Sequence, residues 1–435
     1  MNNTICSLGE RKYASPLLEV NWGGRSPFVD DRLRMYYNVF TDKDHHDNKE
    51  LTFELAGPRE KLYFNPEETR SAIVTCGGLC PGLNDVIRSI VMVSYYYYGS
   101  KSIYGIRYGY GGLNPANGHE PIELYPDLVE DIHTDGGTIL SSSRGGTENM
   151  DILVDTLEKM KINILYTIGG DGTLKGAHRI SEMARARGLD LAVIGVPKTI
   201  DNDISFIQRS FGFETAFSRA GEAILAAHVE AKGAPNGIGL VKLMGRHSGF
   251  IAANAALAMN DVNVVLVPEE HFDLDGPRGL LAHLKDRIVR RGHAVLCVAE
   301  GAGQDLLENQ AGPEGRDASG NLKLGDIGLF LKDQINSFFK KEGIEINLKY
   351  IDPSYMIRSA PAVPGDSVLC ALLGQNAVHA GMAGKTDMII GIWNNIYTHV
   401  PIELAISKRK QIDPHSKFWY SVLTATGQPL SMKNH

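Results

Sequence analysis

The sequence predicts an α/β fold, built on open and mostly parallel β-sheets that are flanked by helices. Two observations lead to this prediction. Short apolar runs rich in β-branched residues recur along the chain, and helical stretches separate many of them. Nearly continuous apolar runs are typical of parallel strands that are buried on both faces. Repeated strand–helix units imply ligands at the loops that follow the carboxyl ends of the strands.

The first strand is predicted at Ser71–Cys76, and a glycine-rich turn leads from it into an apolar helix over Asn84–Tyr98. A second helix is expected at Phe250–Met259. The polar, glycine-rich stretch Gly301–Leu322 is interpreted as a surface loop. Residues 1–70 have no clear periodicity, so we expect an extension that wraps over the core or takes part in subunit contacts. The other predicted strands are Ile162–Ile168, Leu191–Val196, Gly239–Met244, Val262–Val267, Ala294–Ala299, Ile344–Ile351 and Met388–Trp393.

The composition is that of an ordinary globular protein, with 43% hydrophobic and 22% charged residues. A length of 435 residues favours two domains. The net charge of −7 gives no general attraction to nucleic acid or to an anionic membrane, so neither is an expected partner. Five cysteines without a Cys-x-x-Cys pair, and the absence of a signal-peptide pattern, favour reduced thiols in the cytoplasm.

A glycine-rich turn that holds one acid, Gly169–Thr173 (GGDGT), follows a predicted strand and opens a helical stretch. Glycines allow backbone N–H groups to approach phosphate oxygens, and the N-terminus of the following helix favours an anion. The carboxylate of Asp171 is a suitable ligand for Mg²⁺ held between phosphates. The alternative is an ordinary turn in which Thr173 is the N-cap of the helix.

Two acids lie in the segment Val196–Asp203 (VPKTIDND), directly after another predicted strand. Asp201 and Asp203 are two residues apart, so in an extended backbone their side chains point to the same side. One carboxylate could accept a hydroxyl proton while the other helps to hold the metal and phosphates. The alternative is a pair of solvated loop acids, which are common in proteins.

Charged residues follow other predicted strands. Arg246, in Leu243–Gly249 (LMGRHSG), could offer several N–H donors to a transferring phosphoryl group. Arg144 lies beside glycines, and Glu269 comes directly after Val262–Val267 and Pro268. Taken singly, these residues are also consistent with solvated charges. The same holds for the cluster of Lys349, Tyr355 and Arg358.

Together these phrases resemble the 6-phosphofructokinase family, in a match that runs from about Ile73 to Trp393. Gly-Gly-Asp-Gly, Pro-x-Thr-Ile-Asp-Asn-Asp and Met-Gly-Arg in this order are highly specific for that family. The extension and the segment Tyr350–Ser359 are similar to the long branch of the family, close to its pyrophosphate-using enzymes.

The resemblance implies two open, mostly parallel, Rossmann-like sheets flanked by helices, with the active site in the cleft between them. It implies an ATP-binding domain at residues 71–213 and 365–410 and a fructose 6-phosphate-binding domain at residues 214–364. An N-terminal extension (1–70) and a C-terminal tail (411–435) would complete the chain. An allosteric homotetramer (or dimer) is the family expectation.

The resemblance also implies roles for individual residues in the family's glycolytic reaction, the phosphorylation of the 1-hydroxyl of fructose 6-phosphate by ATP. Asp201 would accept the hydroxyl proton, with Arg246, Thr199 and Asp203 as further catalytic residues, and Asp171 would hold Mg²⁺. ATP would contact Gly78, Arg144, Gly145, Gly170, Asp171, Gly172 and Thr173. The sugar phosphate would contact Thr199, Ile200, Asp201, Met244, Gly245, Arg246, Glu269, Lys349, Tyr355 and Arg358.

Gly172 and Lys198 are expected to determine the phosphoryl donor. The resembling pyrophosphate enzymes carry Asp where Gly172 stands, and that carboxylate would occupy the space of the α-phosphate of ATP and repel it. The glycine therefore favours ATP. Lys198 matches the pyrophosphate enzymes, so a pyrophosphate-dependent phosphofructokinase is one alternative. A non-catalytic regulatory subunit is another, although Asp171, Asp201 and Arg246 are intact. A lipid or NAD kinase is a further alternative. Those kinases share Gly-Gly-Asp-Gly but lack the Pro-x-Thr-Ile-Asp-Asn-Asp motif.

Overall fold

The computed structural model describes residues 3–38, 51–307, 315 and 324–435. The chain forms two compact units. The first unit comprises Met1–Thr199, Ile204–Gly212 and Ser359–Arg409. The second unit comprises Ile200–Asp203, Phe213–Arg358 and Lys410–His435.

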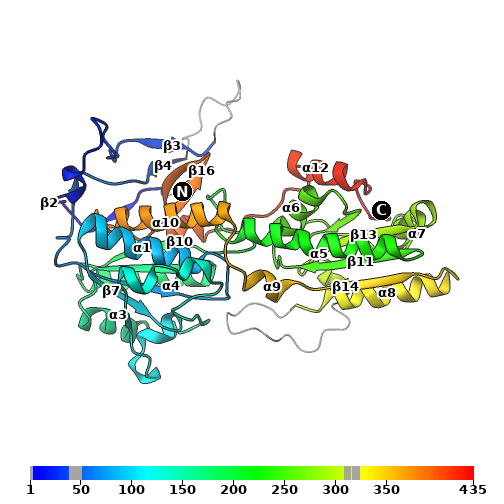
Figure 1. Ribbon diagram of the computed structural model, residues 1–435, viewed down its shortest axis with the longest axis horizontal. Helices are drawn as coiled ribbons and strands as arrows, with labels where there is room; N and C mark the ends of the chain where they lie inside the picture. Colours follow the sequence, from blue (N-terminus) through cyan, green and yellow to red (C-terminus); the bar gives the residue numbers. More distant parts are fainter. Residues whose placement is uncertain (1–2, 39–50, 308–314, 316–323) are drawn as a thin grey trace. The chain divides into compact units, whose positions relative to one another are not determined.

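The first unit is built on a nine-stranded sheet with the order β3-β4-β17-β16-β10-β9-β6-β7-β8 (Figure 1). Its central strands, from β16 to β7, are parallel, whereas β8 and the three strands at the opposite edge are antiparallel to their neighbours. Every residue of β9 and β10 is buried, which explains their unbroken apolar sequence. The strands are β3 (Arg34–Tyr36), β4 (Thr52–Leu55), β6 (Arg70–Thr75), β7 (Ser102–Ile106), β8 (Ile122–Glu123), β9 (Ile164–Gly169), β10 (Ala192–Pro197), β16 (Met388–Trp393) and β17 (Ile396–Pro401).

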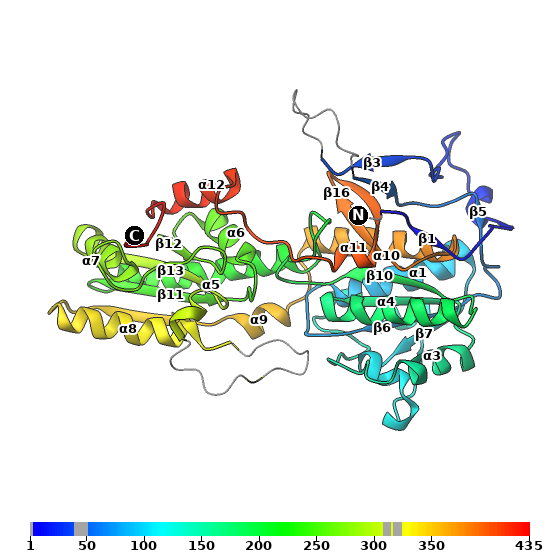
Figure 2. The ribbon, with the colours of Figure 1, turned by 180° about the vertical axis from the view of Figure 1, so that it is seen from behind.

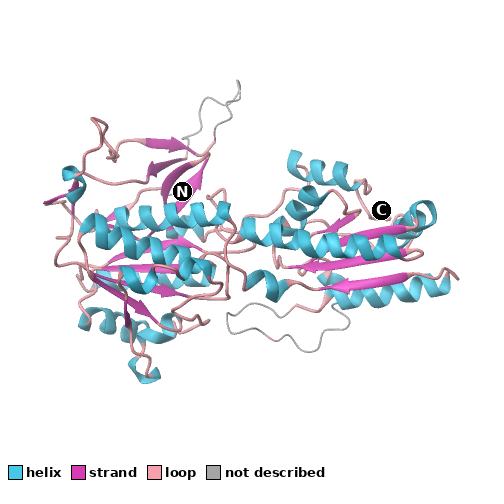
Figure 3. Ribbon diagram, in the orientation of Figure 1, coloured by secondary structure: helices cyan, strands magenta, loops and turns pink. Residues whose placement is uncertain are grey.

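Helices cover both faces of this sheet (Figure 3). On one face α1 (Leu83–Tyr98) packs against α10 (Pro364–Met382), and on the other α3 (Met150–Lys159) packs against α4 (Asp171–Ala186). The apolar residues of α4 recur every three or four positions, which gives the helix one buried face. The short helices α2 (Pro126–Val129) and α11 (Ile402–Ala405) complete the unit.

The second unit has a fully parallel four-stranded sheet with the order β12-β13-β11-β14 (Figure 2). Side chains of β11 alternate between two apolar cores, with Val241 and Leu243 in one core and Ile238 and Leu240 in the other. The first core contains α5, α6 and α12, and the second contains α7 and α8. The elements are α5 (Phe213–Gly233), β11 (Gly237–Leu243), α6 (Phe250–Met259), β12 (Val264–Leu266), α7 (Leu280–Arg291), β13 (His293–Ala299), α8 (Ile327–Lys341), β14 (Asn347–Ile351), α9 (Ser354–Arg358) and α12 (Lys417–Thr426).

The α/β class and the predicted strands are confirmed, with strand bounds that shift by at most three residues. The N-terminal extension differs from expectation, because its described residues form five short strands although no periodicity indicated them. Strands of two to four residues are too short to show an alternating pattern. Most of the predicted loop Gly301–Leu322 lies outside the described residues. The remaining short strands are β1 (Cys6–Ser7), which pairs with β15 (Lys385–Thr386), and β2 (Tyr13–Ala14), which pairs with β5 (Lys61–Leu62).

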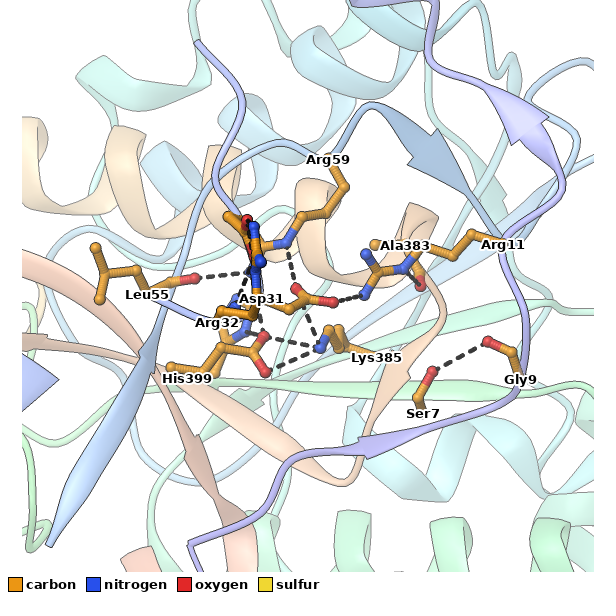
Figure 4. Close-up of polar contacts among 12 residues, drawn as sticks. Ser7, Gly9, Arg11, Asp31, Arg32, Leu55, Arg59, Ala383, Lys385 and His399 are labelled. Carbon is orange, nitrogen blue, oxygen red and sulfur yellow. Dashed lines mark hydrogen bonds and ion pairs between the residues drawn. The ribbon is translucent and has the colours of Figure 1, made fainter. Parts of the chain in front are cut away.

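A cluster of charged side chains joins the extension to the edge of the large sheet (Figure 4). Lys385 Nζ lies 2.8 Å from the Glu54 carboxylate, and His399 Nδ1 lies 2.9 Å from it. Arg59 lies 3.1 Å from Glu54 and 2.6 Å from Asp31. All of these side chains except Asp31 are buried. This buried charge cluster therefore couples the extension to strands that come more than 300 residues later, as the 331-residue separation of Glu54 and Lys385 shows.

Candidate active site

Loops at the carboxyl ends of β6, β9 and β10 meet in the first unit. The backbone N–H of Cys76 donates to Ile168 O at 3.0 Å, and that of Lys198 donates to Gly169 O at 3.0 Å. The N–H of Gly77 donates to Ser143 O at 2.8 Å, which adds the neighbouring loop. These bonds bring together the loops that carry the residues predicted to contact ATP. Those residues are Gly78, Arg144, Gly145, Gly170, Asp171, Gly172 and Thr173.

The glycine-rich turn continues directly into α4, whose first residue is Asp171 and whose N-cap is Gly170. Thr173 lies in the first turn of the helix, so the interpretation of Thr173 as the N-cap is wrong. A Cβ on Gly169 would lie 2.1 Å from Thr173 Oγ1, so close packing requires glycine there. A Cβ on Gly172 would meet nothing within 4 Å. Packing within the protein therefore does not require glycine at position 172, and the space that a side chain would occupy there is open.

The carboxylate of Asp171 is partly exposed at the N-terminus of α4, where the helix field favours negative charge. Lys175 Nζ lies 2.8 Å from this carboxylate, and Arg409 lies 3.7 Å from it. The described residues contain no group of three or more His, Cys, Asp or Glu side chains that could hold a metal ion. A metal at Asp171 would therefore depend on substrate phosphates and water for its other ligands, which is the usual situation of Mg²⁺ in kinases.

Lys198 is a buried cation beside the first phosphate loop. Its side chain is 7% exposed, and its ammonium donates to the carbonyl oxygen of Gly78 at 2.7 Å. Lys198 Nζ is also the atom that a Cβ on Gly77 would approach, at 3.4 Å. The two residues expected to determine the donor thus differ in setting, because Lys198 is enclosed and Gly172 faces open space.

Asp201 is an acid of the second unit whose pKa is strongly shifted. Burial is the main cause that raises its pKa to about 8, and the negative charges of Asp203 and Glu300 add to this effect. A backbone hydrogen bond and the charge of Arg246 act in the opposite direction. Among the described residues, no hydrogen-bond partner is found for Asp201 Oδ1. A buried carboxyl with a raised pKa and a free oxygen is well suited to accept a proton.

The loop that carries Arg246 is held tightly against the end of β13. Gly245 has a φ of +128°, and a Cβ there would lie 2.5 Å from Ser248 O. A Cβ on Gly301 would lie 1.9 Å from Arg246 O, so the two loops touch through their backbones. Ser248 Oγ donates to Asp201 O at 3.0 Å. Arg246 and Asp201 are therefore brought together, and Met244, two residues before Arg246, is buried in the apolar core.

Glu269 is engaged with the backbone. Its carboxylate accepts from Gly249 N–H at 3.0 and 3.1 Å and from Ile412 N–H at 2.8 Å. Gly249 precedes α6 and has no side chain to cap it, so Glu269 supplies the missing acceptor. These contacts favour a structural role for Glu269, and its predicted contact with the sugar stays a prediction.

Three predicted sugar-phosphate residues lie on β14 and α9. Lys349 is exposed on β14, and Tyr355 is 78% exposed on α9. The Arg358 guanidinium lies 4.9 Å from the centre of the Tyr355 ring, which orients both side chains. Arg358 also contributes, with Arg246, to the positive charge that acts on Glu300.

Glu300 and Lys410 lie close to the acids of the Val196–Asp203 segment, and the sequence did not single them out. Burial raises the pKa of Glu300, while the charges of Arg246, Lys242 and Arg358 lower it, so this carboxylate lies among the cations of the site. Glu300 directly follows β13 and could have been found by the strand-end rule that located Asp201. Lys410 had no such signal, because it lies far along the chain in a segment without regular structure.

Comparison with known proteins identifies the family to which the chain belongs. The Phosphofructokinase family model matches residues 70–381. The chain belongs to the phosphofructokinase family. An ATP-dependent 6-phosphofructokinase from Borreliella burgdorferi is 52% identical, over 99% of this chain and 97% of its own length. Another ATP-dependent 6-phosphofructokinase, from Amycolatopsis methanolica, is 49% identical over 97% of this chain and 94% of its own length.

Solved structures support the phosphofructokinase fold. A pyrophosphate-dependent phosphofructokinase from Marinobacter aquaeolei has a TM-score of 0.67 and 20% identity, and covers 83% of this chain and 91% of its own. Phosphofructokinase from Pichia pastoris in the T-state has a TM-score of 0.64 and 21% identity, covering 82% of this chain and 37% of its own. At these identities the likeness concerns the fold alone. Within the described ranges, no helix is long and apolar enough to cross a membrane.

Proposed function

We propose that this protein is an ATP-dependent 6-phosphofructokinase, which transfers the γ-phosphate of ATP to the 1-hydroxyl of fructose 6-phosphate in glycolysis. The products are fructose 1,6-bisphosphate and ADP. The observation that carries this proposal is the near full-length similarity to two enzymes named ATP-dependent 6-phosphofructokinase. The open space at Gly172 agrees with a donor larger than pyrophosphate. We further propose a cytoplasmic homotetramer or dimer.

The loops of the first unit would hold the donor. Backbone N–H groups around Gly78 and Gly170 are suited to phosphate oxygens, and Arg144 would add a cation. Asp171 would hold Mg²⁺, which would neutralise charge on the phosphates when bound. In the structure, Lys175 and Arg409 balance the negative charge of Asp171. The residues proposed to contact ATP are Gly78, Arg144, Gly145, Gly170, Asp171, Gly172 and Thr173.

The second unit would hold most of the acceptor-side residues. Asp201 would take the proton of the 1-hydroxyl, because its raised pKa makes it a stronger base than an ordinary carboxylate. Arg246 would bind the transferring phosphoryl group, and Arg358 with Lys349 would bind the 6-phosphate. Thr199, Ile200, Asp203, Met244, Gly245, Glu269 and Tyr355 are proposed as the other acceptor-side residues.

The direct test is an assay of purified protein with fructose 6-phosphate and either MgATP or Mg-pyrophosphate, at matched concentrations. We expect fructose 1,6-bisphosphate with ATP at a kcat/KM well above that with pyrophosphate. The buried Lys198 is the observation that favours pyrophosphate as the alternative donor. A higher kcat/KM with pyrophosphate would replace the proposal by that alternative, and no product with either donor would overturn both.

Gly172→Asp is expected to weaken the use of ATP far more than the binding of fructose 6-phosphate. The added carboxylate enters open space, so the fold should tolerate it while the α-phosphate of ATP is repelled. The measurement is kcat/KM for ATP and for pyrophosphate, with Gly172→Ala as the uncharged control. An ATP kcat/KM equal to that of wild type in Gly172→Asp would contradict the steric account of donor choice.

Arg358→Ala and Lys349→Ala are each expected to raise KM for fructose 6-phosphate. The loss of a hydrogen bond to a charged group corresponds to roughly 1.5–3 kcal/mol of binding free energy. KM for ATP should change little. Arg290→Ala, on the exposed face of α7, serves as a control for the loss of a surface cation. If ATP affinity falls while that of the sugar phosphate is unchanged, these residues do not form the 6-phosphate pocket.

The pH profile of kcat/KM should reflect the raised pKa of Asp201. Proton acceptance requires the ionised carboxylate, so kcat/KM for fructose 6-phosphate should rise with pH through an apparent pKa near 8. Glu300→Gln removes a negative charge that raises this pKa, so the rise should move to lower pH. Glu222→Gln, an exposed acid on α5, should leave the profile unchanged. A rise near pH 4 in wild type would contradict the assignment.

A further inference from the structure

Lys242 lies near the carboxyl end of β11, on the sheet face that packs against α7 and α8. Side chains alternate along a strand, so Lys242 points to the same face as Ile238 and Leu240, whose side chains lie in the apolar core that contains those helices. Its own side chain is 14% exposed. β11 and β14 are parallel, with Val241 opposite Ile351, so this cation lies where both strands end.

Two carboxylates hold the ammonium of Lys242. Its Nζ lies 2.9 Å from Asp352 Oδ2 and 3.1 Å from Asp326 Oδ2. Burial acts to lower the pKa of Lys242, but its hydrogen bonds to Asp352 and Asp326 raise this pKa above the usual value, so the lysine stays charged at neutral pH. Partly buried ion pairs are screened by salt much less than those of the open surface. The side chain of Lys242 therefore joins the end of β11 to the segment that follows β14 and to the start of α8.

Each of the two acids also holds the start of a helix. Asp326 is the N-cap of α8 and accepts from two backbone N–H groups of the first turn, at 3.0 and 3.1 Å. Asp352 accepts from the backbone N–H of Ser354 at 3.1 Å and from the Ser354 hydroxyl at 2.5 Å. Ser354 is the first residue of α9. Lys242 thus binds the acid that holds the N-terminal end of α9.

α9 carries Arg358, which is proposed above to bind the 6-phosphate. Ile357, on the same helix, is buried in the apolar core of α5 and α6, and Asp352 holds the N-terminal end. Among the described residues, no hydrogen-bond partner is found for the buried Arg358 Nε. A helix of a single turn has few internal hydrogen bonds to fix its direction. The direction of α9, and with it that of Arg358, therefore depends on these two anchors.

We propose that Lys242 is a positioning residue for the 6-phosphate site, because its ion pair with Asp352 fixes the start of α9 and thereby the direction of Arg358. This inference rests on the proposed function and adds to it a residue of an internal strand of the second sheet. Lys242 would act through Arg358, at the phosphate that does not react. Its loss should therefore raise KM for fructose 6-phosphate and change kcat little.

The test compares Lys242→Met, which keeps the aliphatic stem, with Lys242→Arg, which keeps the charge. We expect Lys242→Met to raise KM for fructose 6-phosphate roughly 5–10-fold, less than the loss of an Arg358 hydrogen bond to the phosphate would. kcat and KM for ATP should stay within about twofold. Lys242→Arg should recover most of the wild-type KM. Lys285→Met is the matched control and should equal wild type, because Lys285 also pairs with an acid of the same unit, Glu342 at the C-terminal end of α8.

A double-mutant cycle with Arg358→Ala tests whether Lys242 acts through Arg358. In the Arg358→Ala background, Lys242→Met should change KM for fructose 6-phosphate by less than about twofold. Asp352→Asn, which keeps an oxygen for Ser354 but loses the charge, should raise this KM as Lys242→Met does. Asp326→Asn should leave it near the wild-type value, because Asp326 holds α8 and not α9.

Thermal unfolding of each variant separates positioning from folding. The proposal is overturned if Lys242→Met keeps the wild-type KM for fructose 6-phosphate, or if it raises this KM equally with and without Arg358. It is also overturned if Lys242→Met and Lys242→Arg lose kcat equally and both unfold at a lower temperature, since the lysine would then be structural. Failure of wild type to phosphorylate fructose 6-phosphate with either donor would overturn the proposed function, and the role of Lys242 with it. An active wild type with an unaffected Lys242→Met overturns only the role of Lys242.

Discussion

Asp201→Asn is expected to lower kcat by about 10²–10⁴-fold, the usual contribution of a positioned general base, with little change in KM for fructose 6-phosphate. Asparagine keeps the shape of the side chain but cannot accept the hydroxyl proton. The carboxyl of Asp201 is buried and its pKa is raised to about 8. The substitution therefore tests the loss of a proton acceptor and not the loss of a surface charge.

Steady-state kinetics with MgATP and fructose 6-phosphate give both constants, and circular dichroism checks that the variant folds. Glu222→Gln on the exposed face of α5 in the same unit is the control for replacing an acid by its amide. Retention of more than about a tenth of the wild-type kcat by Asp201→Asn would show that another group accepts the proton.

Glu54→Gln is expected to destabilise the first unit by about 3–5 kcal/mol, because its removal leaves the buried cations with the more exposed Asp31 as their remaining acidic partner. Lys385 and Arg59 both depend on Glu54, and each is less than 5% exposed. Burial alone would raise the pKa of Glu54, but hydrogen bonds and charges of His399 and Lys385 hold it at about 2.

The pH dependence follows from this low pKa. The folded-state pKa of Glu54 lies below its ordinary value, so its contribution is fully present above about pH 4.5 and is lost as the pH falls toward 2. Denaturant unfolding of wild type and Glu54→Gln should therefore differ at pH 7 and converge in acid. Asp30→Asn, which breaks the exposed Asp30–Arg32 ion pair in the same extension, should unfold like wild type. Equal unfolding of Glu54→Gln and wild type at pH 7 would exclude the cluster as an anchor.

Contiguous patterns made most of the fold predictable. The unbroken apolar runs of β9 and β10 are visible in the sequence because both faces of these strands are buried. The glycine turn before α4 is also local, since its strand end, turn and helix start lie within a few residues. The strands of the extension could not be predicted in this way, because each is short, and β1 and β4 pair with strands that come much later in the chain.

The sequence by itself determined the α/β class, the family resemblance and the strand-end segments that contain Asp171, Asp201 and Arg246, because neighbouring residues carry all of that information. Only the tertiary structure decided what surrounds them. Lys198 reaches Gly78 across 120 residues, and the charges that act on Asp201 include Glu300, which lies on a different strand end. Burial and electrostatic fields arise from parts of the chain that are remote in sequence. For this reason the sequence named Asp201, whereas its raised pKa and the contact of Lys410 with Asp203 required the folded chain.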